Sequence, residues 1–389
     1  MNKVRFGIIG VGGMGSGHAR IITEAKSKDF SLAAVADIDA ARAEAVGRQY
    51  GVPHFTDGLA LMDSGLVDAV IIATPHYFHP PLTIAAARRK RHVLSEKPIA
   101  VAVGPARAAV EECRKNKVAM GVMFQQRTRP DMIKVKQMVD SGAIGPIIRI
   151  QMICSSWYRS QAYYDSGTWR GTWNGEGGGI LINQAPHSLD LFQWIGGMPA
   201  RVLATVGTRT HKIEVENTAN AVLTYPDGHS GYIYATTAES PGVERLIVAG
   251  EKGTLVAEDG KVMFGKLDKP LTKHLFSDAT WGHPEVAWKE LPLPKGKSGH
   301  IEVTKAFVNH ILKGKPLVAA GVEGLNELEL SNAVYISGYR GKAVELPVKA
   351  AEMERLLADL AKKHDTGKSP NYRTAAAGKL KKLLGKLPA

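Results

Sequence analysis

A glycine-rich turn near the N-terminus constrains the fold of this chain more than any other feature. Gly10, Gly12 and Gly15 form the pattern G-x-G-x-x-G directly after an apolar run, and helical patterning follows. This strand–turn–helix context is typical of a loop that binds a dinucleotide. The first glycine permits a tight turn, the second lets the backbone approach a pyrophosphate, and the third allows the helix to pack closely on the strand. The pyrophosphate is expected at the helix N-terminus, beside Gly13 and Met14.

Asp37 indicates which dinucleotide the turn would bind. It ends the second predicted strand and lies 22 residues after Gly15 (37 − 15). A carboxylate at this place can accept hydrogen bonds from the adenosine ribose and repels a 2′-phosphate. The sequence therefore predicts NAD, rather than NADP, as the cofactor. The alternative, a glycine turn that binds nothing, does not account for this context.

The hydrophobic pattern divides the chain into two domains and a tail. Residues 1–127 alternate apolar strands with amphipathic helices, which predicts an α/β Rossmann domain with a doubly wound parallel sheet. In residues 128–348 a helix is followed by period-two runs that are separated by turn signals. This pattern predicts an α+β domain with a large, mostly antiparallel sheet. Residues 349–389 are expected to form a C-terminal helix and a basic tail.

The net charge of +13 raises the question of nucleic-acid binding. Residues 362–389 hold eight Lys or Arg and one acidic residue, so about half of the excess (8 − 1 = +7) lies in the tail, which is expected to be mobile. A second cluster, Arg-Arg-Lys-Arg at residues 88–91, falls at an expected helix end, where cations complement the helix dipole. Nucleic-acid binding is therefore not expected.

The remaining composition narrows the class of protein further. No apolar run approaches the roughly 18–20 residues that a membrane span needs, and the N-terminus lacks the pattern of a secretory signal. Cys113 and Cys154 are far apart and lack metal-ligand spacing. We expect a cytoplasmic protein with packing cysteines, no membrane partner and no metal site.

Three further motifs carry chemistry. The segment Thr-Pro-His-Tyr-Phe-His (74–79) follows one predicted strand, and Ser-Glu-Lys-Pro (95–98) follows the next. The carboxyl ends of parallel strands meet at one edge of the sheet, where its ligands bind. The third motif, GGGILINQAPHSLD at residues 177–190, joins three glycines to a polar face. Together with the glycine turn, these motifs resemble the glucose-fructose oxidoreductase / inositol dehydrogenase / MocA (Gfo/Idh/MocA) family over roughly residues 3–348.

The resemblance implies a role for several residues. Lys97 would reach the reacting hydroxyl, while Glu96 and Gln125 would line the nicotinamide half of the cofactor. It also implies that the open sheet of residues 128–348 supports the substrate site and often carries oligomer contacts, so a homo-oligomer (a dimer or a tetramer) is expected. His76 and His79 could instead serve local structure at a helix start. The expected cofactor-binding set is Gly10, Gly12, Gly13, Met14, Gly15, Asp37, Thr74, Pro75, His76, His79, Glu96, Lys97 and Gln125.

The predicted chemistry centres on His187 and Lys97. Oxidation of a secondary alcohol needs a base for the hydroxyl proton, and an imidazole suits this role. Lys97 would stabilise the developing alkoxide, although the two roles could be shared or swapped. The family usually places Asp four residues before this histidine, and here Asn183 stands there. Asn183 could contact substrate, orient His187 or cap a helix at 184–195; Asp190 is the alternative orienter, or a structural residue.

An aromatic segment at residues 157–173 is the candidate for sugar recognition, because aromatic faces pack well against the C–H faces of sugars. Tyr163, Trp169, Arg170 and Trp173 are the predicted substrate contacts, together with Lys97, Asn183 and His187. The segment could instead fold around its own aromatic core or form an oligomer interface. Arg159 is a further candidate, and Arg127 could bind substrate or pair at the domain junction.

The sequence thus predicts an NAD-dependent oxidoreductase acting on a secondary hydroxyl of a sugar, glycoside or cyclitol, with pyranoside C3 as the finer hypothesis. The first alternative is an NAD-retaining glycosidase that works by transient oxidation and elimination, with Tyr163 or Tyr164 as an added acid or base. The second is a non-catalytic regulator that senses NAD or sugar.

Overall fold

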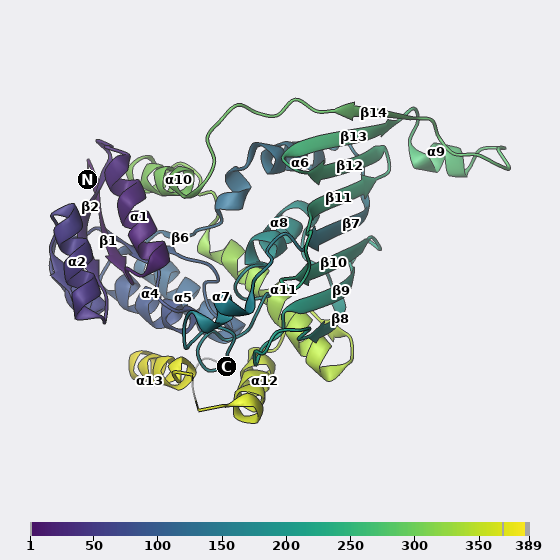
Figure 1. Cartoon of the computed structure of the whole chain (residues 1–389). Coiled ribbons are helices and arrows are strands. Elements are labelled where there is room, and N and C mark those ends of the chain that lie inside the picture. Colours follow the sequence, from purple (N-terminus) through teal and green to yellow (C-terminus); the bar gives the residue numbers. More distant parts are fainter. Residues whose placement is uncertain (1, 368, 386–389) are drawn as a thin grey trace.

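The computed structural model describes residues 2–367 and 369–385 and contains two sheets (Figure 1). The first sheet has six parallel strands in the order β3-β2-β1-β4-β5-β6. Its central strand β4 is buried along its whole length, as expected for a sheet with helices on both faces. The predicted Rossmann domain is confirmed. The strands are β1 Val4–Ile9, β2 Phe30–Ala36, β3 His54–Phe55, β4 Ala69–Ile72, β5 His92–Ser95 and β6 Met120–Val122; the helices are α1 Gly13–Glu24, α2 Ala40–Tyr50, α3 Gly58–Asp63, α4 His79–Arg88 and α5 Val103–Asn116, with short 3-10 turns at His76–Phe78 (η1) and Gln125–Thr128 (η2).

The second sheet has nine strands in the order β14-β13-β12-β11-β7-β10-β9-β8-β15. Its strands pair antiparallel except for β7 and β10, which are parallel, so the predicted mostly antiparallel sheet is confirmed. The strands are β7 Ile147–Cys154, β8 Arg201–Gly207, β9 Thr218–Thr224, β10 Ser230–Thr236, β11 Glu244–Gly250, β12 Gly253–Glu258, β13 Lys261–Leu267, β14 Val286–Glu290 and β15 Val344–Glu345.

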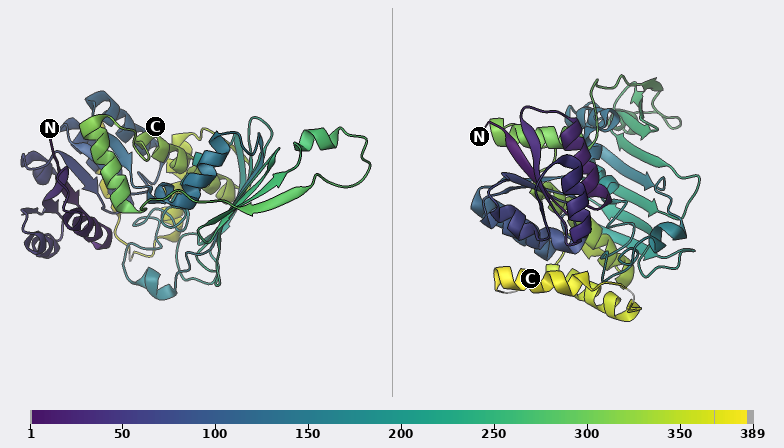
Figure 2. Two further views of the ribbon diagram at one scale, coloured as in Figure 1. Left: turned by 90° about the horizontal axis from the view of Figure 1, so that it is seen from above. Right: turned by 60° about the vertical axis from the view of Figure 1, so that its left-hand side comes forward.

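Helices cover the face of the second sheet that is turned toward the first sheet (Figures 1 and 2). They are α6 Pro130–Asp140, α8 Pro186–Gly196 and α11 Gly321–Arg340, and α11 also contacts β6 and α5 of the first sheet. The opposite face alternates polar residues with apolar ones, and Leu203, Val222 and Tyr232 lie beside one another on adjacent strands. The side chains of Leu203 and Val222 are about half exposed, at 52% and 53%.

One helix of the later chain returns to the first sheet. In α10, His300–Lys313, the side chains of Val303, Phe307 and Val308 join Phe6 and Ile8 in one apolar cluster. The core of the first sheet is therefore completed by residues from far along the chain. The division of the chain at residues 127 and 348 stays a prediction.

The C-terminal region is helical, whereas its last part was expected to be a mobile tail. It forms α12, Ala350–His364, and α13, Tyr372–Leu384, and α13 packs on α4, where Leu380 is buried against Ile84. Because one stripe of α13 is apolar, this part of the chain gains a packed position while Lys381 and Lys382 stay exposed. The expectation of a mobile tail is wrong for residues 372–384.

Two further helices of the chain are short. The helix α7, Gln161–Asp165, lies in the aromatic segment, and α9, Leu271–Leu275, lies in an arm between β13 and β14 that extends away from the sheet (Figure 2). Among the described helices, none has both the length and the apolar character that crossing a membrane requires.

Candidate active site

The glycine turn has the geometry that a dinucleotide needs. Gly10 has a positive φ of 87°, and a Cβ there would lie 2.8 Å from the main-chain oxygen of Ala73. A Cβ on Gly15 would collide with the main-chain oxygen of Gly10, so the third glycine lets α1 pack against the turn. Gly12 and Gly13 face open space at the start of α1, with nothing within 4 Å of an added Cβ. The turn therefore has room for a pyrophosphate where the helix N–H groups are free.

Asp37 lies directly beside this turn. One carboxylate oxygen accepts a hydrogen bond from the main-chain N–H of Val11 at 2.9 Å, and the other accepts from that of Asp39 at 3.0 Å. A guanidinium nitrogen of Arg42 lies 3.3 Å away. The same nitrogen lies 3.4 Å from the second carboxylate oxygen, so a ribose hydroxyl would take the place of one of these two longer contacts to a half-exposed arginine. The neighbouring Ile38 is 87% exposed and offers an apolar surface at the same edge.

Lys97 joins the two halves of the molecule. It follows β5, and its Nζ donates a hydrogen bond of 2.8 Å to the main-chain oxygen of Asn183. Burial lowers the pKa of the Lys97 ammonium, while the charges of Glu96 and Glu327 oppose this effect. The structure thus brings the Ser-Glu-Lys-Pro motif and the second glycine motif together.

Glu96 is held by a residue that the sequence analysis missed. Its Oε1 lies 2.7 Å from Nε2 of His18 on α1, and the His18 ring lies 5.4 Å from that of His300 on α10. Burial acts to raise the pKa of Glu96, but His18 and Lys97 outweigh it and lower the pKa to about 2. Glu96 is therefore an anion beside Lys97. Neither histidine lies in a motif, and only the fold brings them here.

His187 contacts Gln125, as a split site across the two sheets requires. The Gln125 side-chain amide donates to Nε2 of His187 at 3.2 Å, which places the proton of the neutral ring on Nδ1. Burial and the nearby Lys97 charge lower the pKa of His187 well below its usual value. Gln125 Oε1 and His187 Nδ1 are buried and have no partner among the described residues, so each retains an unused hydrogen-bonding position.

Asn183 does not cap the following helix, so that expectation is wrong. The helix α8 begins at Pro186, with Ala185 as its N-cap. The side-chain amide of Asn183 donates instead to Oε1 of Glu176 and, at 3.2 Å, to the hydroxyl of Tyr163. Glu176, which the sequence analysis did not single out, is thus part of the site. Its place directly before the three glycines was the available signal.

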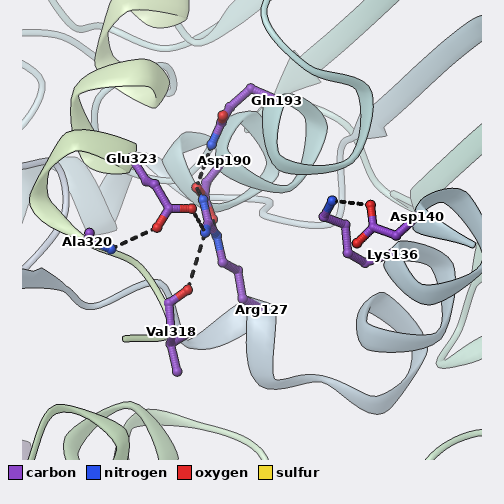
Figure 3. Close-up of polar contacts among 8 residues, drawn as sticks. All are labelled: Arg127, Lys136, Asp140, Asp190, Gln193, Val318, Ala320 and Glu323. Atoms are coloured by element: carbon purple, nitrogen blue, oxygen red, sulfur yellow. Dashed lines mark hydrogen bonds and ion pairs between the residues drawn. The ribbon is translucent and has the colours of Figure 1, made fainter. Parts of the chain in front are cut away.

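Asp190 is a structural residue and does not orient His187. Its carboxylate forms a buried ion pair with Arg127, which also binds Glu323 of α11 (Figure 3). Of the two roles considered for Arg127, the structure therefore favours pairing at the junction between the two sheets over binding substrate. Because both side chains are buried, removal of either one would leave the charge of the other unpaired and away from water.

Three of the four predicted aromatic-segment contacts lie together. The Arg170 guanidinium donates to the Tyr163 hydroxyl at 2.7 Å and lies 4.6 Å from the ring centres of both Tyr163 and Trp169. The Trp169 ring meets the His76 ring edge-on at 5.9 Å. Trp173 differs, because it is fully buried and its Nε1 donates to the main-chain oxygen of Glu214. The expectation that Trp173 contacts substrate is therefore wrong.

The segment after β4 lies beside the glycine turn. Thr74 Oγ1 is buried without a partner among the described residues, and Pro75 precedes η1. His76 Nδ1 donates to the main-chain oxygen of Glu176 at 3.1 Å. Each ring nitrogen of His79 lies 2.7 Å from a carbonyl oxygen, those of Thr74 and Pro98. His79 therefore fixes the two loops, and its nitrogens are not free for a cofactor.

The residues at this edge fit NAD. The open turn at Gly12 and Gly13 suits a pyrophosphate, and the unpartnered Gln125 Oε1 suits a donor such as a carboxamide. Apart from His79, both of whose ring nitrogens are engaged by carbonyl oxygens, the predicted cofactor-binding residues stay predictions.

Comparison with known proteins gives the family. A model described as "Oxidoreductase family, NAD-binding Rossmann fold" matches residues 4–124, and one described as "GFO/IDH/MocA C-terminal domain" matches residues 132–256. Inositol 2-dehydrogenase from Rubrobacter xylanophilus is 30% identical over 258 residues, 65% of this chain and 71% of that protein. The inositol 2-dehydrogenase of Rhizobium meliloti is 25% identical over 336 residues, 85% of this chain and 95% of that protein.

A solved structure agrees with this result. The WlbA dehydrogenase from Bordetella pertussis, in complex with NADH and UDP-GlcNAcA, has a TM-score of 0.76 and 28% identity, covering 89% of this chain and 100% of that one. The resemblance seen in the motifs is thus confirmed over both sheets, and the cofactor is NAD. This chain belongs to the Gfo/Idh/MocA family of NAD-binding oxidoreductases.

Proposed function

We propose that this enzyme transfers a hydride between nicotinamide and a secondary hydroxyl of a sugar, glycoside or cyclitol. The contact that carries the proposal is the Lys97 Nζ hydrogen bond to the main-chain oxygen of Asn183, next to the His187–Gln125 pair. It brings an ammonium and an imidazole together at the edge of the sheet where the cofactor binds. The inositol 2-dehydrogenases among the relatives support a polyhydroxylated substrate.

The roles of the residues follow from their protonation. NAD, when bound, accepts the hydride from the carbinol carbon, so the protein must remove the hydroxyl proton. The lowered pKa of His187 keeps its ring neutral at neutral pH, and the ring can take that proton at Nε2 once the substrate displaces the Gln125 amide from this nitrogen. Lys97 stabilises the oxygen as negative charge develops, and the lowered pKa of its ammonium also allows it to share the proton transfer.

Substrate recognition falls to the aromatic segment. Tyr163 and Trp169 flank the Arg170 guanidinium, which offers donors between two aromatic rings. Such a surface suits a ring with an apolar face and hydroxyls at its rim. A pyranoside oxidised at C3 is the finer proposal, and the UDP-GlcNAcA bound by the WlbA neighbour supports a nucleotide sugar or glycoside as the class to test first.

The test is an assay of the purified protein with NAD and a panel of inositols, glycosides and nucleotide sugars. Reduced cofactor, followed by its ultraviolet absorbance, and the position of the new carbonyl identify the reaction. Lys97→Met should lower kcat by about 10²–10⁴-fold, whereas Lys115→Met, an exposed lysine on α5, should leave it unchanged. If no panel member reduces NAD and no ketosugar consumes NADH, the dehydrogenase proposal fails.

Two other results would point to the alternatives. Release of an aglycone with unchanged cofactor would indicate the oxidation–elimination glycosidase. A biological activity that survives both Lys97→Met and His187→Ala would indicate a regulator.

The outer face of the second sheet supports the proposal of a homo-oligomer. Leu203 and Val222 are half exposed there, and Ile247, Val256 and Met263 continue the same row on β11, β12 and β13. A row of apolar side chains of this kind is typical of a contact between subunits. Val222→Glu should shift the protein to a smaller species in light scattering, and an unchanged mass would remove this face from consideration. A cytoplasmic location remains our proposal and agrees with two buried free cysteines, Cys113 and Cys154.

A further inference from the structure

A buried carboxyl group lies directly behind Asn183. Glu176 is 1% exposed and belongs to the loop between the aromatic segment and the three glycines. Its Oε2 accepts a hydrogen bond of 2.7 Å from the main-chain N–H of Gly171, and its Oε1 accepts from the side-chain amide of Asn183. Its main-chain oxygen also accepts from His76 Nδ1. This residue therefore connects the aromatic segment, the loop after β4 and the second glycine motif.

The contact determines how Asn183 can act. Its Nδ2 donates one hydrogen to Glu176 Oε1 and directs the other toward the Tyr163 hydroxyl, an acceptor that it shares with Arg170 and Gln184. Its Oδ1 receives no hydrogen bond from the described residues, and its main-chain oxygen accepts from Lys97. Between residues 173 and 193, Asn183 is the residue whose side chain is partly exposed, while the others are buried. Its free oxygen is thus available to a donor from outside the protein.

We propose that Glu176 is a positioning residue, which holds the Asn183 amide by its nitrogen so that Oδ1 accepts a hydrogen bond from a substrate hydroxyl beside Lys97. The proposal rests on the proposed dehydrogenase function. It deepens that function in two ways. It assigns a buried carboxylate to the site, and it fixes which end of the Asn183 amide, the oxygen, faces the substrate. Without Glu176 the amide could turn by half a rotation and present two donors, which a hydroxyl oxygen bound to Lys97 does not need.

The surroundings of Glu176 are of mixed charge. Arg170 faces it from the aromatic segment and Lys97 from the loop after β5, while Tyr164 lies near it on α7. Burial raises its pKa to about 7, against the hydrogen bonds from Gly171 and Asn183 and the charges of Arg170 and Lys97. A second carboxyl group at position 183 would therefore touch an existing one. Two carboxyls in contact share one proton over a wide pH range, as in an acidic dyad, and they repel each other once the pH is high enough to remove it.

The test is a double-mutant cycle of Asn183→Asp and Glu176→Gln. Asn183→Asp alone should lose activity increasingly as the pH rises from about 6 to about 8, because the two carboxylates then repel. Glu176→Gln alone should raise the KM for substrate by about tenfold, the size of one hydrogen bond, with NAD affinity unchanged. The double variant has one carboxylate again, so it should recover at least about tenfold in kcat/KM over Asn183→Asp.

A matched control is available in Glu216. Burial also raises the pKa of this carboxyl to about 7, but it accepts from the main chain at Gly179 and Leu181 and from Tyr335, not from Asn183. Glu216→Gln should lower the melting temperature and should not restore Asn183→Asp. Additive effects of Asn183→Asp and Glu176→Gln would overturn the proposal.

The outcomes stay distinguishable from failure of the proposed function. The wild type must first turn over a sugar or cyclitol with NAD and lose that activity on Lys97→Met; a wild type with no such activity refutes the proposed function and, with it, the substrate role of Asn183. If Glu176→Gln does not fold, Asn183→Asp decides alone. A loss of kcat/KM that does not change with pH would then overturn the role of Glu176.

Discussion

Arg127 binds Asp190 through two hydrogen bonds, from Nε at 2.8 Å and from Nη2 at 2.6 Å, and neither side chain is more than 1% exposed. Arg127 follows the last strand of the first sheet, and Asp190 lies on α8, which covers the second sheet. Glu323 at the start of α11 completes the cluster from a third direction (Figure 3). A buried ion pair thus stabilises the junction that brings Lys97 and His187 together.

Replacement of Arg127 by Met should destabilise the protein by about 3–5 kcal/mol, because Asp190 would remain buried without its cation. Lys136→Ala provides the control in the same region (Figure 3). Lys136 pairs with Asp140 on one face of α6, where Asp140 is 58% exposed, so its removal should cost less than about 1 kcal/mol. Denaturant unfolding of the two variants measures both values. Equal losses would show that burial adds nothing to the Arg127 pair.

Asp37→Ser should shift cofactor preference from NAD toward NADP. The substitution removes the charge that repels a 2′-phosphate and leaves Arg42, now 3.3 Å from Asp37, free to bind one. A charge-assisted hydrogen bond of about 1.5–3 kcal/mol corresponds to a change of about ten- to a hundredfold in the ratio of kcat/KM values. Asp39→Ser is the control, since Asp39 pairs with the same arginine at the surface. A preference that moves equally in both variants would contradict the role of Asp37.

The elements that local patterns determine could be predicted from the sequence. The turn at Gly10 is fixed by its glycines, and the strands of the first sheet are mostly apolar, so the sequence alone places Lys97 and Gln125 at one edge. The second glycine motif likewise identified His187 as a candidate site residue. The sequence therefore predicts that Lys97 and His187 face each other across the two sheets, whereas the hydrogen bond from Lys97 to the main-chain oxygen of Asn183 was not predicted.

The residues that depend on distant contacts could not be predicted. Trp173 has the same local setting as Trp169, and only packing against Tyr335 and Tyr339 makes it a core residue. His18 and His300 meet because α10 returns to the first sheet, which no local pattern indicates. The tail was misjudged because its lysines dominate the composition, whereas the apolar stripe with Leu380 determines its packing.

The pH dependence of alcohol oxidation should lack a histidine inflection near pH 6.5. Burial and the Lys97 charge lower the pKa of His187, so its ring is neutral through the neutral range and gains a proton only in more acidic solution. The acid limb of kcat/KM should accordingly lie well below its usual position for an imidazole. A pH–rate profile with saturating NAD measures this limb. A limb centred at the ordinary histidine pKa would show that His187 is solvated in the working enzyme.

Glu327→Gln should make the protein progressively more stable than the wild type as the pH rises. Glu327, on α11, is fully buried, and neither carboxyl oxygen has a partner among the described residues. Burial, with the charge of Asp190, raises its pKa well above the usual value, against the opposing effect of Lys97. The folded state then binds the proton more tightly than the unfolded state, so stability is lost as the pH climbs from about 4.5 toward the folded-state pKa. Glutamine mimics the protonated group and does not ionise.

Thermal unfolding of the wild type and Glu327→Gln between about pH 5 and about pH 9 measures this difference. Glu111→Gln is a control of opposite sign, because a hydrogen bond from Arg114 lowers the pKa of this exposed carboxyl. Loss of the Glu111 charge should therefore make the variant slightly less stable than the wild type at higher pH. A gap between wild type and Glu327→Gln that is constant with pH would mean that Glu327 ionises equally in both states. The carboxyl would then be solvated in the folded protein, and its burial would be incomplete.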